Sequence, residues 1–176
     1  MRKIVYYVAS TLDGYIAGPN GDVSQFMQEG EGVDQYLYDL QEFDTVIMGR
    51  KTYEFGYQFG LKPGQPAYPH MKHHVFSASL NFKESSEQVQ VEKLDLEVVQ
   101  KLKNGVGSEI YLCGGGEFAG WLLDNQMIDI LKIKLNPVFL GGGTRLFGSS
   151  KMPCTMKMKD HRPYADGLQI MTFDLN

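Results

Sequence analysis

The sequence has few cysteines, no long hydrophobic run and little net charge. Its two cysteines, Cys113 and Cys154, show no CxxC spacing, which argues against a disulfide framework or a zinc site and indicates reduced thiols. No stretch approaches the roughly 20 apolar residues of a membrane-spanning helix, and the charged, strand-like residues 1–7 lack the layout of a signal peptide. We therefore expect a cytoplasmic protein without a membrane partner.

The charge balance also bears on the partners. A formal net charge of −4 offers no basic field for the phosphates of DNA or RNA, which argues against a nucleic-acid partner.

The chain has 176 residues, of which 43% are hydrophobic, and no linker or repeat interrupts it. We expect one globular domain, residues 1–176, with a sizeable core.

Periodicity predicts alternating strands and helices. β-branched and aromatic runs predict strands at residues 4–9, 45–48, 75–77, 110–113, 128–139, near 156 and at 169–173. Helical spacing and capping residues predict helices at residues 33–43, from 50 onward, 95–105 and 117–125. Alternation with an all-strand finish predicts an α/β fold, with a mostly parallel sheet and antiparallel strands at its C-terminal edge.

The strongest local signal is the segment Gly114-Gly115-Gly116-Glu117-Phe118-Ala119, which follows a strand and opens a helix. Glycine permits close backbone approach, and the free N–H groups at a helix N-terminus favour a phosphate. The spacing matches G-x-G-x-x-A, but no acidic residue follows at the distance that a Rossmann site requires. The alternative is a tight turn that needs glycine for packing alone.

A second junction of the same kind carries two adjacent cations, in Met48-Gly49-Arg50-Lys51-Thr52. Arginine binds phosphate through a planar fork and lysine adds a point charge, so this pair could select a 2′-phosphate. The alternative is a solvated Arg-Lys pair on an ordinary helix. Two such junctions in one small α/β domain suit a dinucleotide, which has phosphates in two places.

Other polar residues are weaker candidates. Asp13 follows the first strand, where α/β sheets tend to bind ligands, but an Asp before Gly is also typical of an Asx-turn. His70, His73 and His74 lack a carboxylate at matching spacing, so we expect no metal site. Gly141 to Gly143 lie between strand-like segments and predict a turn or bulge.

Three segments together resemble the dihydrofolate reductase-like proteins: Ala9-Ser10-Thr11-Leu12-Asp13-Gly14-Tyr15-Ile16-Ala17, Val46-Ile47-Met48-Gly49-Arg50-Lys51-Thr52-Tyr53-Glu54 and Glu109-Ile110-Tyr111-Leu112-Cys113-Gly114-Gly115-Gly116. A fourth, from Leu135 to Phe147, is similar to the reductase domain of bacterial riboflavin biosynthesis, the RibD C-terminal domain. The chain resembles a stand-alone member of that branch, because no deaminase half is fused to it.

The resemblance implies a three-layer α/β/α fold with NADPH lying across the strand ends. It implies that Ala9 and Ile16 contact the nicotinamide end, and that Ser77 lies near the adenosine 2′-phosphate. It also assigns the cofactor phosphates to two sets of residues: Gly49, Arg50, Lys51 and Thr52, and Gly114, Gly115, Gly116, Glu117, Phe118 and Ala119. By the same comparison Asp34 stands close to the acidic residue that binds the pteridine in folate reductases.

The leading interpretation is an NADPH-dependent reductase acting on a small pterin-like or pyrimidine-like compound, similar to 5-amino-6-(5-phosphoribosylamino)uracil reductase. Asp13 is the first candidate for the polar substrate contact and Asp34 the second. The alternatives are a nucleotide- or ligand-binding protein that has kept the fold without turnover, and a weak dihydrofolate reductase. The C-terminal strands could pack across a two-fold axis, so we expect a homodimer.

Overall fold

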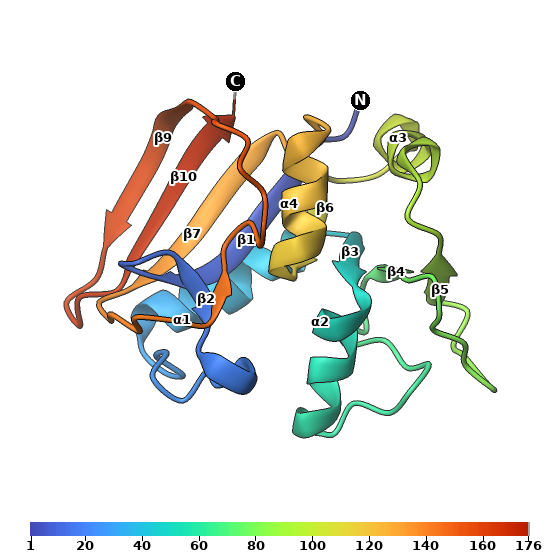
Figure 1. Cartoon of the computed structure of the whole chain (residues 1–176), viewed down its shortest axis with the longest axis horizontal. Helices are drawn as coiled ribbons and strands as arrows, with labels where there is room; N and C mark the ends of the chain where they lie inside the picture. The colour runs from blue at the N-terminus through green and yellow to red at the C-terminus, as the bar shows by residue number, and fades with distance from the viewer. Residues whose placement is uncertain (176) are drawn as a thin grey trace.

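The computed structural model describes residues 1–175 and shows a mixed sheet covered by helices on both faces (Figure 1). The sheet has eight strands in the order β5-β4-β3-β6-β1-β7-β10-β9. The strands are β1 (Ile4–Thr11), β3 (Thr45–Gly49), β4 (Lys72–Phe76), β5 (Val89–Glu92), β6 (Ile110–Gly114), β7 (Ile130–Asn136), β9 (Met156–Pro163) and β10 (Gln169–Leu175). Two shorter strands, β2 (Tyr15–Ala17) and β8 (Thr144–Arg145), pair antiparallel beside it.

Strands β5 to β7 in this order run parallel, and β10 pairs antiparallel with both β7 and β9. The predicted fold class, including the antiparallel C-terminal strands, is therefore confirmed. The apolar run of β1 lies in the middle of the sheet and is buried on both faces, as a continuous hydrophobic strand requires.

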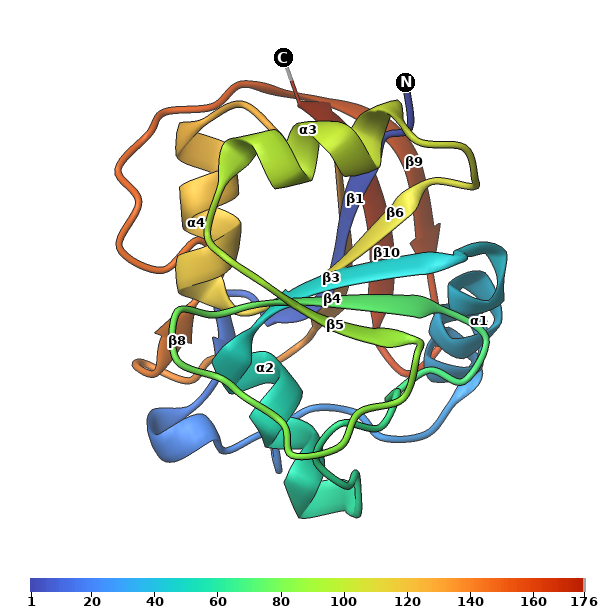
Figure 2. The ribbon, with the colours of Figure 1, turned by 90° about the vertical axis from the view of Figure 1, so that its right-hand side faces the viewer.

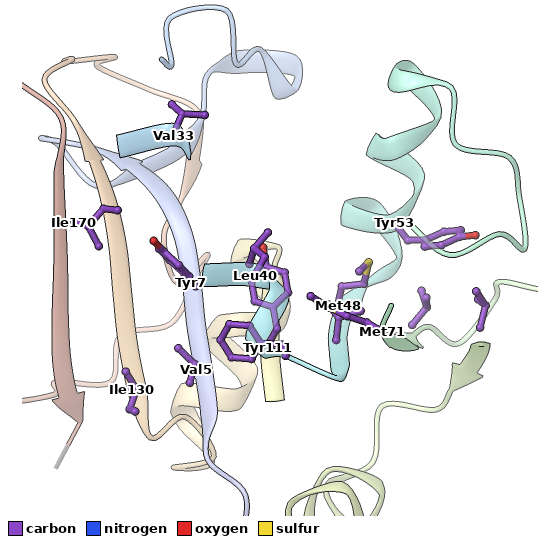
Figure 3. Close-up of a cluster of buried hydrophobic side chains, with 14 of the residues drawn as sticks. Val5, Tyr7, Val33, Leu40, Met48, Tyr53, Met71, Tyr111, Ile130 and Ile170 are labelled. Carbon is purple, nitrogen blue, oxygen red and sulfur yellow. The ribbon is translucent and has the colours of Figure 1, made fainter. Parts of the chain in front are cut away.

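The helices are α1 (Glu31–Asp39), α2 (Arg50–Phe55), α3 (Leu96–Asn104) and α4 (Gly116–Asp124), with short 3-10 turns η1 (Pro19–Gly21), η2 (Leu40–Glu42) and η3 (Gly56–Phe59). Figure 2 shows α1 on one side of the sheet and α3 and α4 on the other. The α1-side core joins Val33 and Leu40 to Tyr7 and Ile170 on the strands (Figure 3). The α4-side core joins Leu122 of α4 to the other sheet face. None of the helices in residues 1–175 is long and apolar enough to cross a membrane.

Candidate cofactor and substrate cleft

A cleft of about 1260 Å³ lies where several parallel strands end. Met48 of β3, Phe76 of β4, Cys113 of β6 and Val8 of β1 line it. The strands of an open α/β sheet bind ligands outside their carboxyl ends, so the cleft has the position that the fold favours. In Figure 1, α2 lies on one side of this region and the segment of β2 and η1 on the other.

The cleft has two halves that belong to different cores. One half, which we call the glycine half, includes Gly49 to Thr52, Phe76 and the start of α4 at Gly115 to Phe118. The other, the tyrosine half, is formed by the residues Val23, Tyr53, Phe55, Phe59, Leu61, Ala67, Tyr68 and Cys113. Phe76 and Phe118 pack into the α4-side core, whereas Tyr53 and Tyr68 pack with the α1-side core.

The two glycine-bearing junctions meet in the glycine half. A Cβ atom on Gly115 would lie 2.9 Å from Thr52 Oγ1, and one on Gly116 would lie 2.3 Å from the Arg145 carbonyl oxygen. Neither position has room for a side chain, so the two junctions and the segment of Arg145 pack closely against one another here. Helix α4 begins at Gly116, and no side chain caps it at Gly115, so its first N–H groups are available to an anion.

Three cations line the cleft, and one of them was not predicted. Arg50 is exposed, and its Nε lies 3.8 Å from a carboxylate oxygen of Glu54 on the next turn, a spacing typical of a weak surface pair. Lys51 and Arg145 also line the cleft and are exposed. Glu117, the one predicted acidic residue here, accepts a hydrogen bond from the Ser149 hydroxyl at 2.7 Å. Arg145 is the second residue of β8, which directly follows Gly141 to Gly143, where the sequence indicated a turn and no phosphate role.

The structure brings most of the predicted cofactor residues together. Those that line the cleft are Ile16, Gly49, Arg50, Lys51, Thr52, Gly115, Gly116, Glu117 and Phe118. Gly114 is buried at the end of β6, and Ala119 is fully buried on the inner face of α4. Ala9 is half-buried on β1, outside the lining residues. Ser77 lies outside them as well, and its Oγ accepts hydrogen bonds from the backbone N–H groups of Ser79 and Leu80.

The two predicted catalytic carboxylates do not lie in the cleft. Asp13 accepts hydrogen bonds from Thr11 Oγ1 at 2.6 Å and from the backbone N–H of Gly141 at 2.7 Å. This carboxylate therefore holds the turn after β1 against the loop after the neighbouring strand β7. The N–H that an Asx-turn would use, that of Tyr15, donates to Thr11 Oγ1 instead. Asp34 is exposed on α1, and neither residue lines the cleft. Neither carboxylate is therefore placed to contact a ligand in this cleft.

Another aspartate of α1 meets the sheet instead. Asp39 is buried, accepts a hydrogen bond from the Tyr7 hydroxyl at 3.0 Å and pairs with Lys132 at 2.5 Å. Burial tends to raise the pKa of Asp39, but the hydrogen bonds from Lys132, Gln35 and Tyr7 outweigh it and lower the pKa. Asp39 therefore stays ionised inside a satisfied network on the α1 side.

A group of hydroxyls and a thiol beneath the tyrosine half was missed by sequence reasoning. The Tyr36 and Tyr111 hydroxyls lie 2.7 Å apart, and the Tyr68 hydroxyl lies 3.6 Å from Cys113 Sγ. Burial raises the pKa of Tyr68 well above its ordinary value and also raises that of the Cys113 thiol, so both remain protonated. Cys113 directly precedes the glycine turn, and this position is the one feature of the sequence that could have indicated a cleft residue. Tyr68 comes from a proline-rich loop without periodicity.

The three histidines separate in the structure. His73 is fully buried and hydrogen-bonded to backbone atoms, whereas His70 is exposed. His74 Nδ1 contacts a Glu92 carboxylate oxygen at 2.9 Å. Within residues 1–175, no group of three or more His, Cys, Asp and Glu side chains is arranged to hold a metal ion.

The sequence and the fold are similar to those of several known proteins. The chain is 30% identical to YwjB, an uncharacterized protein of Bacillus subtilis strain 168, over 96% of both chains. Its fold matches a putative riboflavin biosynthesis protein from Shewanella sp. PV-4 with a TM-score of 0.78 and 24% identity, covering 100% of this chain and 99% of that one. It also matches the dihydrofolate reductase of Enterococcus faecalis complexed with NADP(H), with a TM-score of 0.69 and 18% identity, covering 99% and 96%.

The model of the RibD C-terminal domain matches residues 2–170, which is nearly the whole chain. The three-layer dihydrofolate reductase-like fold and the predicted family are thereby confirmed. The chain belongs to the RibD C-terminal domain family.

Proposed function

We propose that the protein is a reductase that binds NADPH in the glycine half of the cleft and reduces a small heterocyclic compound in the tyrosine half. The observation that carries this proposal is that the two glycine-bearing junctions pack against each other at Gly115 and Thr52, where the uncapped start of α4 borders the cleft. Two separate anion-binding features at one cleft match a dinucleotide better than a single phosphate.

The residues of the glycine half fit the parts of this cofactor. The first N–H groups of α4 would hold the pyrophosphate, and Arg50 and Lys51 would bind the 2′-phosphate that distinguishes NADPH from NADH. The rings of Phe76 and Phe118 stack 4.8 Å apart, and Trp121 stacks on Phe118 at 5.9 Å, which provides flat apolar surface for a base. The bound cofactor would supply a hydride, and the chain's own task is to orient the acceptor and exclude water.

The first experiment titrates the purified protein with NADPH and NADH while following the fluorescence of Trp121. This is the sole tryptophan of the chain, and it lines the cleft. We expect tight binding of NADPH, weaker binding of NADH and a change in Trp121 emission in both cases. Calorimetry on the same samples provides a label-free control. Failure of both nucleotides to bind would overturn the proposal.

The alternative of a binding protein without turnover is separated by a second measurement. NADPH-loaded protein is offered a panel of pterins, pyrimidines and dihydrofolate, and the loss of reduced nicotinamide is followed by absorbance. Oxidation with a heterocycle of this panel supports the reductase, whereas cofactor binding with no oxidation across the panel supports the binding protein. We expect dihydrofolate to react weakly or not at all, because neither Asp34 nor Asp39 of α1 lines the cleft.

A further inference from the structure

The charged side chains of the cleft are confined to one half. Among the lining residues that the structure describes, the groups charged at neutral pH are Arg50, Lys51, Arg145 and Glu117. They belong to the first turn of α2, to β8 and to the first turn of α4, which surround the glycine half. This distribution means that the proposed cofactor site and the proposed substrate site differ sharply in charge.

The tyrosine half carries aromatic and aliphatic side chains instead. Phe55, Phe59 and Leu61 line it, and none of its lining residues within 1–175 bears a carboxylate, ammonium or guanidinium group. The Tyr53 hydroxyl already donates a hydrogen bond to the Gln65 carbonyl oxygen at 2.7 Å. The Tyr68 hydroxyl lies 3.6 Å from the Cys113 sulfur, a weaker partner, and beside the Tyr111 hydroxyl. Tyr68 is therefore the group in this half that is best placed to serve a ligand.

Desolvation decides which ligand such a surface accepts. A phosphate or carboxylate that enters it loses hydration without gaining a cation, and an uncompensated buried charge is among the most costly groups in a protein. A flat aromatic ring, by contrast, gains contact with Phe55 and Leu61 at little polar cost. Because burial keeps the phenol of Tyr68 protonated, its hydroxyl is a hydrogen-bond donor.

We propose that the tyrosine half binds an uncharged planar aromatic ring that carries neither phosphate nor carboxylate, and that Tyr68 donates a hydrogen bond to an oxygen or nitrogen of that ring. The inference rests on the proposed function, which assigns the cofactor to the other half. It predicts that a phosphate or carboxylate attached to the ring finds no cation among the lining residues of this half.

The test uses pterin and pterin-6-carboxylate, two fluorescent compounds that differ by one carboxylate. Each is titrated against the full-length protein with and without saturating NADPH. We expect pterin to bind at least tenfold more tightly than its carboxylate. Equal or tighter binding of the carboxylate, or binding of neither compound, would overturn the inference. Loss of NADPH binding with the preference for pterin retained would instead remove the proposed function and leave the charge selectivity standing.

Variants locate the effect in the tyrosine half. Tyr68→Phe removes the hydroxyl that donates the hydrogen bond. It should weaken the binding of pterin roughly fivefold to tenfold without changing the affinity for NADPH. Tyr57→Phe is the matched control, because Tyr57 packs edge-on against Tyr53 but does not line the cleft. Ala67→Arg adds a cation at an exposed lining position and should improve binding of pterin-6-carboxylate relative to pterin. Identical pterin affinities in the two Tyr→Phe variants would refute the role of Tyr68.

Discussion

His73 lies on β4, next to the edge strand β5, and contacts Tyr68 of the tyrosine half of the cleft. Its Nε2 accepts a hydrogen bond from the backbone N–H of Tyr68 at 3.1 Å, and its Nδ1 donates to the Met71 carbonyl oxygen at 3.1 Å in the tautomer that this pairing requires. The imidazole also stacks on the Tyr68 ring, with centroids 5.9 Å apart. The neutral ring therefore fits this site, because a second N–H would face a backbone donor.

This arrangement predicts a loss of stability in mild acid. Burial lowers the pKa of His73 from 6.5 to about 4, so the unfolded chain takes up this proton at higher pH than the folded one does. The stability that the neutral His73 contributes is fully present above the pKa of the unfolded chain. It is lost as the pH falls from that pKa toward the pKa of His73 in the folded protein. Between about pH 7 and pH 4.5 the free energy of unfolding should fall by about 2 kcal/mol on account of His73.

Urea denaturation of the wild type and of His73→Gln at these two pH values measures this contribution as a difference. The wild type should lose more stability on acidification than His73→Gln does, because glutamine does not titrate. His161→Gln is the control, since His161 is exposed on β9 and hydrogen-bonds to Gln169. Equal acid sensitivity of the wild type and His73→Gln would contradict the assignment.

Arg50 carries the prediction on cofactor choice. Its exposed guanidinium lines the cleft and is held by a long contact to Glu54. Arg50→Ala should therefore weaken the binding of NADPH by about tenfold, in keeping with the loss of one charge-assisted contact. The binding of NADH should weaken much less. Dissociation constants for both nucleotides provide the measurement, with Lys62→Ala, an exposed position outside the lining, as control. An equal loss for NADPH and NADH would remove Arg50 from the 2′-phosphate.

At this scale the sequence predicted backbone features better than side-chain targets. The glycine junctions were predictable because Gly115 and Gly116 serve local geometry that neighbouring residues specify. Asp13 and Asp34 lie outside the cleft, because a carboxylate's surroundings depend on what lies opposite it, here the loop at Gly141 for Asp13 and solvent for Asp34. Tyr68 could not be found, since its partners come from distant segments.

At the scale of elements, capping and periodicity predicted the helices and most strands. The sequence predicts Asp95 as the cap of α3, and its side chain accepts a hydrogen bond from the Glu97 N–H at 2.9 Å. Strand β7 ends at Asn136, shorter than the predicted strand, because Pro137 cannot donate to a sheet. Strand β5 was missed: it has two apolar residues alternating with two polar ones, too short a pattern to stand out.

The packing of α4 gives a prediction about one glycine. A Cβ on Gly116 would meet the Arg145 carbonyl oxygen at 2.3 Å and the Gly148 nitrogen at 3.1 Å, both of them backbone atoms. Gly116→Ala should therefore lower the free energy of unfolding by about 1–3 kcal/mol through overpacking. It should also weaken NADPH, because the start of α4 must move away from the loop that carries Arg145.

Gly142→Ala is the matched control for this variant. A Cβ on Gly142 meets no atom within 4 Å, so this variant should change neither stability nor NADPH affinity. Urea denaturation and nucleotide titration of the two variants provide the comparison. If Gly116→Ala has wild-type stability, the loop of Arg145 and Gly148 moves without loss of free energy. That result would contradict the argument that the close approach of the backbone requires glycine at this position.

At the scale of the whole molecule, the sheet explains why the position of the cleft could be predicted from the sequence, whereas the side chains that line it could not. Ligand sites follow from strand order, which alternating strands and helices largely determine. The charge contrast between the two halves depends instead on how α2, the 60–69 loop and β8 fold over the strand ends. Those segments are irregular or short and carry little periodic signal, so the substrate half was beyond sequence reasoning.

The exposed C-terminal edge of the sheet gives the prediction on assembly. Met156 and Met158 of β9 are 39% and 50% exposed, and they pair with Leu175 and Phe173 of β10, whose side chains lie on the same face. An apolar face at the end of a sheet is a site where a second copy gains by packing. We expect a homodimer in which these methionines are covered, whereas the charged side chains of β9 discourage extension of the sheet itself.

Light scattering at micromolar concentration measures the mass of the wild type and of a Met156→Asp, Met158→Asp variant. The wild type should have the mass of a dimer and the variant that of a monomer, because two desolvated carboxylates oppose the packing. Phe139→Asp is the control, since Phe139 is 76% exposed on the loop after β7. It should leave the mass unchanged. A monomeric wild type would refute the dimer, and a dimeric variant would transfer the contact to another surface.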